Sequence, residues 1–210
     1  CNNSGLRPPQ ERGGPWTIIG DPTEAALLVL AVKGGIDIAA RNATLPRIGQ
    51  LPFEAVRKRM TSINREGDRT VAHVKGAPAE TLALCSSILL DNTVIPLTGE
   101  MRAAILAEND RMAQSGLRVL AMARRDLAFD SGFTVENAER DLVFLGLAGL
   151  MDPPRPEVPQ AVALCRRAGI RVIMVTGDYG LTALAIGRKI GFARTASPRV
   201  VAGRELDEMN

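Results

Sequence analysis

The run Ile170–Val175 constrains the fold more than any other stretch of this sequence. A continuous, β-branched apolar segment of this length is typical of a strand buried on both faces of a parallel sheet. It ends at Thr176-Gly177-Asp178, and helical spacing follows from Leu181 to Ile190, with Gly191 placed as a stop signal. Open α/β sheets bind ligands at the carboxyl ends of their strands, so Thr176–Asp178 are candidate site residues. A plain turn in which Asp178 caps the next helix is the alternative.

A proline-rich connector at Met151–Pro156 separates two patterns. Before it, strands follow one another through hairpins such as Arg59–Ile63 with Thr70–Lys75, which predicts a mainly antiparallel sheet flanked by helices. After it, helix and strand patterns alternate, and a last short strand is expected near Val200-Val201. We therefore expect a mixed α/β (α+β) chain with two domains, residues 1–154 and 155–210. The second domain carries too few elements to bury a doubly wound sheet.

The remaining elements follow from periodicity and turn residues. Residues 4–15, rich in Gly, Pro and Arg, are expected to form a loop. Expected strands are 16–19, 47–53, 117–123, 142–147 and a hairpin over 88–96 that turns at Asp91-Asn92. Expected helices are 25–32, 79–85, 157–168 and one with an apolar stripe from Met101 to Met112 that ends at Gly116.

Composition excludes several classes of function. The chain has 46% hydrophobic and 23% charged residues and a net charge of +3, and its basic residues are scattered. With one Trp, one Tyr and five Phe for base stacking, a nucleic-acid partner is not expected. The three cysteines are far apart and His73 has no ligand partner at metal spacing, so we expect no metal site and a reducing cytosol. The longest apolar run, Leu142–Met151, is shorter than the roughly 20 residues that span a bilayer, which predicts a soluble chain.

Four segments occur together in a specific order: Gly20-Asp21-Pro22-Thr23-Glu24, Lys75-Gly76-Ala77-Pro78, Asp152-Pro153-Pro154-Arg155 and Val175-Thr176-Gly177-Asp178. Each is weak alone, but the ordered set resembles the ATP-handling part of P-type cation-transporting ATPases, of the calcium-pump-like branch. The resemblance covers the chain from Trp16 onwards.

The resemblance implies that residues 1–154 are the nucleotide-binding (N) domain. Residues 155–210 would be part of the phosphorylation (P) domain, with a haloacid-dehalogenase-like parallel α/β fold. The parent would hydrolyse ATP through an aspartyl phosphate and move a cation across a membrane. Its partners would be ATP and, in the parent chain, the rest of the P domain, an actuator domain and a membrane domain. This part of the parent would lie at the cytoplasmic face of the membrane.

Two departures from the family pattern limit the activity expected of this chain. The Asp-Lys-Thr-Gly-Thr motif of the phosphorylated aspartate does not occur here, and neither does the Gly-Asp-Gly-x-Asn-Asp motif that holds Mg²⁺. Mg²⁺ would therefore be held mainly by residues outside this chain, which should bind ATP without turning it over.

The resemblance also assigns residues to a nucleotide site. Phe53 matches the phenylalanine that stacks on adenine, although an ordinary core role is the alternative. Glu24 matches an acidic residue that meets the adenine amino group, although capping at the third position of the next helix explains it equally well. Lys75 matches a lysine that lines the pocket, and Gly76 beside it would leave room for a ligand. A solvated lysine at the end of a strand is the alternative.

Phosphate contacts fall on arginines and lysines. Arg118 matches an arginine that reaches the nucleotide's phosphates, where a bidentate fork suits phosphate oxygens. Calcium pumps often carry a further arginine two residues after the stacking phenylalanine, where this chain has Ala55. Arg57 or Lys58 could replace it.

Thr176, Gly177 and Asp178 match the motif that faces the phosphorylation site. The threonine hydroxyl and the glycine backbone would hold the transferred phosphoryl group, and Asp178 would contact the nucleotide or its magnesium shell. Two rival classes remain: a soluble haloacid-dehalogenase-like phosphatase with a large cap, and a non-catalytic nucleotide-binding or interaction module. A dinucleotide oxidoreductase is disfavoured because no Gly-x-Gly-x-x-Gly follows a strand.

Overall fold

A computed structural model describes residues 2–7, 14, 16–128, 131–193, 195, 198–203, 205 and 208. The chain forms two compact units, Cys1–Ala103 with Leu120–Ala148, and Ala104–Val119 with Gly149–Asn210. The predicted domain boundary near residue 154 stays a prediction. Residues 104–119, which the sequence places in the first domain, lie in the second unit.

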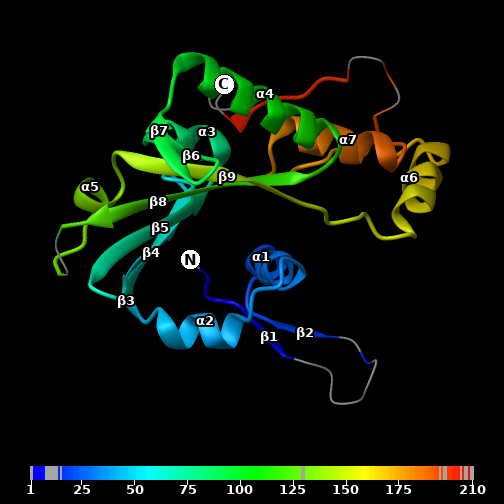
Figure 1. Cartoon of the computed structure of the whole chain (residues 1–210). Coiled ribbons are helices and arrows are strands. Elements are labelled where there is room, and N and C mark those ends of the chain that lie inside the picture. The colour runs from blue at the N-terminus through cyan, green and yellow to red at the C-terminus, as the bar shows by residue number, and fades with distance from the viewer. Residues whose placement is uncertain are drawn as a thin grey trace. The chain divides into compact units, whose positions relative to one another are not determined.

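A seven-stranded sheet dominates the structure, in the order β3-β4-β5-β8-β9-β6-β7 (Figure 1). Its strands are β3 (Arg47–Glu54), β4 (Arg59–Glu66), β5 (Arg69–Gly76), β6 (Cys85–Leu90), β7 (Thr93–Pro96), β8 (Arg118–Leu127) and β9 (Leu142–Leu150). The pairs β3–β4, β4–β5, β5–β8 and β6–β7 are antiparallel, whereas β6 and β9 are parallel. The prediction of a mainly antiparallel sheet is therefore confirmed.

Both predicted hairpins form, and their turns carry the residues that their geometry requires. Gly67 turns from β4 to β5 with φ +60°, a left-handed conformation that glycine adopts without strain. Asp91 and Asn92 join β6 to β7 with φ values of 47° and 62°. Two left-handed residues in a row make a turn whose twist matches paired strands, and Asp and Asn tolerate that conformation.

The N-terminal elements are a two-stranded sheet and two helices, β1 (Gly5–Arg7), β2 (Thr17–Ile19), α1 (Pro22–Lys33) and α2 (Ile38–Thr44). The loop predicted over residues 4–15 is wrong at Gly5–Arg7, which pairs with β2, and residues 8–13 and 15 lie outside the described part. Asp21 caps α1 as predicted, accepting from the Glu24 N–H at 3.0 Å. The sequence did not predict α2, which Asp37 caps in the same way at Ala40.

The remaining helices are α3 (Pro78–Leu82), α4 (Gly99–Gln114), α5 (Val135–Ala138), α6 (Val158–Arg167) and α7 (Gly180–Lys189). The helix predicted over 79–85 is too long, because Cys85 pairs with Leu142 of β9 and so begins a strand. Strand pairing here overrides local helix propensity. In the first unit, Ile63, Ala72, Leu127 and Ala138 form a core cluster against which Leu51 and Phe133 pack.

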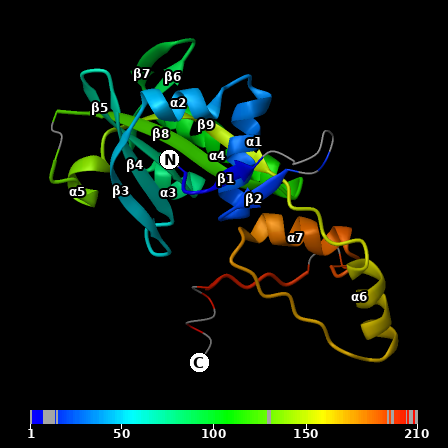
Figure 2. The same cartoon turned by 90° about the horizontal axis from the view of Figure 1, so that it is seen from below.

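The second unit corrects the expectation on which the parallel α/β segment rested. Residues 170–175 form no strand in the described structure and run as an extended segment between α6 and α7 (Figure 2). Ile173 and Val175 are 74% and 91% exposed. A parallel strand needs neighbours on its flanks to satisfy its N–H and C=O groups, and this segment pairs with none among the described residues. The strand predicted near Val200-Val201 is also absent there.

Candidate functional site

Glu24 and Lys75 meet in the first unit, although 51 positions separate them. The Lys75 Nζ donates to Glu24 Oε1 at 2.7 Å, and the two side chains are 9% and 15% exposed. The Glu24 carboxylate also accepts from the Asn3 N–H at 2.6 Å. Glu24 is therefore held by contacts distant in sequence, and Asp21 alone caps α1 with its side chain.

The electrostatics of this pair follow from its partial burial. Burial lowers the pKa of Lys75 more than the Glu24 carboxylate raises it. For Glu24, burial works against ionisation, but hydrogen bonds from Lys75 and the Asn3 N–H outweigh it, so the pKa of Glu24 lies below its ordinary value. The pair is thus an ionised couple beside the sheet.

Lys75 has an apolar setting on the sheet. It lies opposite Met60 of β4 and Met122 of β8 in the two ladders. Residues directly opposite on antiparallel strands point to the same face, so the two methionines flank the lysine stem. A flexible thioether adapts to irregular shapes.

Phe53 lies at the end of β3 and is 65% exposed. Leu51 pairs with Thr61 and Glu54 pairs with Arg59, so Pro52 and Phe53 together face the single residue Met60. This is a β-bulge, a feature that re-aims a side chain and often borders functional sites. Phe53 is therefore not a core phenylalanine, and Met60 lies between its bulge and Lys75.

Arg57 and Lys58 occupy the turn from β3 to β4, but both are held by protein groups. Arg57 donates to Glu54 and to Glu139 at 2.7 and 2.6 Å. Lys58 donates to Glu80 at 2.6 Å and has a left-handed φ of 52°. The role of Lys58 in nucleotide binding stays a prediction.

Gly76 lies beside the same turn. A Cβ added there would lie 2.7 Å from the Lys58 carbonyl oxygen and would also collide with the Arg59 Cβ. The Ala77 N–H donates to that carbonyl at 2.9 Å. The fold itself thus requires glycine here, and the predicted room for a ligand is not needed to explain it.

Thr176, Asp178 and Arg118 come together in the second unit. The Thr176 hydroxyl donates to Asp178 Oδ2 at 2.9 Å, and the Arg118 guanidinium binds Asp178 Oδ1 through Nε at 3.0 Å and through Nη2. Burial works against ionisation of Asp178, but the hydrogen bonds from Arg118 and Thr176 outweigh it and lower its pKa. Gly177 has open space where a Cβ would be.

The predicted nucleotide-binding residues thus fall into two groups. Glu24, Phe53, Arg57, Lys58, Lys75 and Gly76 are in the first unit, whereas Arg118 is in the second with Thr176, Gly177 and Asp178. Glu139 was missed by sequence reasoning. It is 82 positions from Arg57, and no local pattern marks it.

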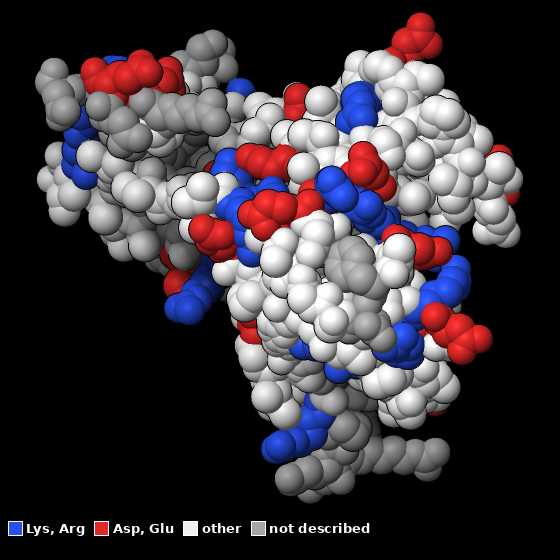
Figure 3. All heavy atoms as spheres, turned by 90° about the vertical axis from the view of Figure 1, so that its left-hand side faces the viewer, with Lys and Arg blue, Asp and Glu red and all other residues white. Residues whose placement is uncertain are grey.

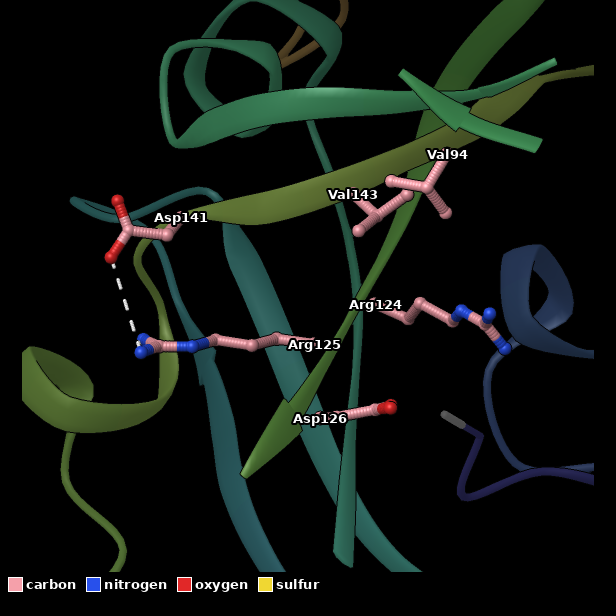
Figure 4. Close-up of a pocket in the computed structure, with 6 residues that line it drawn as sticks. All are labelled: Val94, Arg124, Arg125, Asp126, Asp141 and Val143. Carbon is pink, nitrogen blue, oxygen red and sulfur yellow. Dashed lines mark ion pairs between the residues drawn. The ribbon is translucent and has the colours of Figure 1, made fainter. Parts of the chain in front are cut away.

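A hollow of about 300 Å³ lies elsewhere in the first unit, lined by Val94, Arg124, Arg125, Asp126, Asp141 and Val143. Arg125 points to Asp141, 3.9 Å away, while Arg124 points away from that pair (Figure 4). None of the predicted site residues lines this hollow.

No group of three or more His, Cys, Asp or Glu residues in the described ranges is arranged to hold a metal ion. Acidic and basic side chains are intermixed on the face shown in Figure 3. In the part of the chain that the structure describes, no helix has the length and apolarity to cross a bilayer.

Comparison with known proteins decides the family. The family model described as "P-type ATPase, cytoplasmic domain N" matches residues 1–157. The chain belongs to this family. It is 40% identical to "Cation-transporting ATPase pma1" of Synechocystis sp. and 37% identical to a "Calcium-transporting ATPase" of Bacillus subtilis, with the whole chain aligned in both cases. A "Calcium-transporting ATPase" of Listeria monocytogenes is 34% identical, again over the whole chain.

The resemblance to P-type cation ATPases is thereby confirmed at the level of the family. The chain spans only 22% to 23% of the length of these three relatives. The large sheet with flanking helices is the N-domain part of the expected fold.

Proposed function

We propose that this chain is the ATP-binding part of a P-type ATPase that couples ATP hydrolysis to transport of a cation, of the calcium type, across a membrane. The names of the relatives support the class of transport. One observation carries the binding role: Phe53 is exposed in a bulge whose partner residue, Met60, also pairs with Lys75.

In this proposal the Phe53 ring stacks on adenine, because an exposed aromatic face binds a base without needing hydrogen bonds. Glu24 accepts from the adenine amino group, and Lys75 adds positive charge beside it. Before the nucleotide binds, the ion pair between Lys75 Nζ and Glu24 Oε1, 2.7 Å apart, keeps both side chains oriented.

In the parent protein, closure of a hinge at residues 151–156 would bring the γ-phosphate to an aspartate outside this chain. Thr176, Gly177 and Asp178 would border that phosphoryl group, and Arg118 would reach the phosphates of the nucleotide. Mg²⁺, held mainly by other parts of the parent, would neutralise phosphate charge. At the cytoplasmic face of the membrane, this part would work with the actuator domain, the membrane domain and the rest of the P domain of the parent.

The binding role is tested by titrating ATP against the chain and its Phe53→Ala variant. Stacking on an aromatic side chain is worth about 1–3 kcal/mol per base, so the affinity should fall roughly 5- to 150-fold. The matched control is Val56→Ala, which removes an exposed apolar side chain from the turn that follows β3 and should leave the affinity unchanged. Equal affinities for the chain and Phe53→Ala would reject the adenine site.

A further inference from the structure

The bulge at Phe53 is held from both sides by one side chain. Arg57 Nη2 donates to the Pro52 carbonyl at 2.6 Å, and Arg57 Nε donates to Glu54 Oε2 at 2.7 Å. Pro52 and Glu54 are the two residues that flank Phe53 in the chain. A bulge interrupts the regular ladder, and Pro52 has no N–H to contribute to it. Arg57 therefore ties the backbone on one side of Phe53, at the Pro52 carbonyl, to the side chain on its other side, at the Glu54 carboxylate.

Arg57 is itself oriented by a buried carboxylate. Its Nη1 donates to Glu139 Oε1 at 2.6 Å, and the Glu139 side chain is 0% exposed. Glu139 also accepts from Arg59 Nε at 2.6 Å and from the Thr61 hydroxyl at 2.7 Å. A buried carboxylate with this many donors has one favourable position, because any other would leave a buried charge unpaired.

All three guanidinium nitrogens of Arg57 donate to protein oxygens, and its side chain is only 14% exposed. A guanidinium is a rigid planar fork, so acceptors in three directions fix its plane. Arg57 is therefore poorly placed to bind phosphate. It would have to do so if it replaced the arginine that calcium pumps often carry at the position of Ala55.

We propose that Arg57 and Glu139 form a positioning clamp that sets the orientation of the Phe53 ring and thereby the affinity for the base of the nucleotide. The clamp connects the end of α5, where Glu139 follows Ala138, to the end of β3. Arg57 acts through Phe53 and is a positioning residue. The inference rests on the proposed role of Phe53 in adenine binding.

The decisive variant is Arg57→Lys, which keeps the charge but cannot reach three acceptors in different directions. We expect the affinities for ATP and for AMP to fall by the same factor, roughly 3- to 10-fold, because only part of the stacking contribution is lost. On a Phe53→Ala background, Arg57→Lys should cause no further loss. A larger loss for ATP than for AMP would show a phosphate contact, and full additivity with Phe53→Ala would show that Arg57 acts independently of Phe53. Either result would overturn the clamp.

Two further variants guard against general effects. Arg111→Lys, in an exposed ion pair with Glu108, should change neither affinity. Glu54→Gln weakens the clamp at an exposed position. It should cause a smaller loss of affinity, again equal for ATP and AMP. This variant replaces Arg57→Lys as the test if Arg57→Lys does not fold. No loss in Glu54→Gln together with an unfolded Arg57→Lys would count against the clamp.

A ¹⁹F NMR measurement on the nucleotide-free chain tests the clamp independently of ATP binding. In the chain labelled with 4-fluorophenylalanine, the ¹⁹F signal assigned by Phe53→Leu should shift in Arg57→Lys, while those of Phe133 and Phe144 stay in place. An unchanged Phe53 signal would reject the clamp. Undiminished ATP binding by Phe53→Ala, with a shifted signal, would reject the adenine site and leave the clamp as a structural device.

Discussion

Lys75 shows how one residue can be both buried and charged. Its stem lies beside Met60 and Met122 in the sheet, and its Nζ is compensated by Glu24. Removing water from an ammonium favours the neutral amine, whereas a carboxylate at hydrogen-bonding distance favours the charged one. Burial prevails here, which lowers the pKa of Lys75.

Glu24→Gln should therefore lower the pKa of Lys75 further, because the amide keeps a hydrogen-bond acceptor but loses the negative charge. The measurement is a ¹³C NMR titration of the chain with reductively methylated lysines. Glu80→Gln, which removes the carboxylate beside Lys58, is the matched control and should leave the Lys75 titration where it was. A Lys75 pKa that does not move in Glu24→Gln would mean that Glu24 does not stabilise the ammonium.

His73 gives the chain a pH dependence above the range of its carboxylates. Burial lowers its pKa, and Glu66, whose Oε1 lies 3.2 Å from the ring Nε2, only partly opposes this effect. The folded pKa is thus below the value of about 6.5 in the unfolded chain. Between the two values the unfolded chain binds more protons, so the free energy of unfolding rises with pH up to about 6.5.

We expect urea unfolding to show lower stability at pH 5 than at pH 7.5, with a slope from His73 of at most about 1.4 kcal/mol per pH unit. His73→Gln should flatten this part of the profile. The same slope in both proteins would assign the pH dependence to other groups.

Three elements pack closely together at one point: the β3–β4 turn, β5 and α3. Gly76 is the contact point, since a Cβ there would lie 2.7 Å from the Lys58 oxygen and 2.8 Å from the Thr81 hydroxyl oxygen. Such distances force the backbone or a buried side chain to shift.

Gly76→Ala should consequently destabilise the chain by about 1–3 kcal/mol, the usual cost of overpacking. Gly99→Ala at the start of α4 is the control, since open space surrounds its Cβ position and alanine favours a helix. Equal denaturation midpoints for Gly76→Ala and the parent chain would show that the turn relaxes freely.

The helices, strands and turns were predictable from the sequence to different degrees. The hairpin at Asp91-Asn92 and the cap at Asp21 follow from local chemistry and were confirmed. Residues 170–175 did not form their predicted strand, because strand formation depends on neighbours that periodicity does not reveal. The bulge at Phe53 left no sequence signal beyond Pro52, which cannot donate to the ladder.

For the whole molecule, the proposed function separates binding from turnover. The sequence contains no Asp-Lys-Thr-Gly-Thr string, the motif that carries the phosphorylated aspartate in the family it resembles. We expect the purified chain to bind ATP but to release no phosphate from it in the presence of Mg²⁺. Phosphate release that coelutes with the chain on gel filtration and is lost in Phe53→Ala would contradict this expectation.

The sequence by itself determined the family, the mainly antiparallel sheet and the identity of the exposed aromatic residue to test. The sheet follows from alternation and turn residues, which are local, whereas the family and Phe53 follow from the order of motifs along the chain; both can be read from the sequence without knowing which segments pack together. The tertiary structure decided which charges meet: Glu24 with Lys75 across 51 positions, and Arg57 with Glu139 across 82. Ion pairs between distant segments depend on the register of β3, β4 and β5 and on where α1 and α5 pack, which residue spacing does not encode.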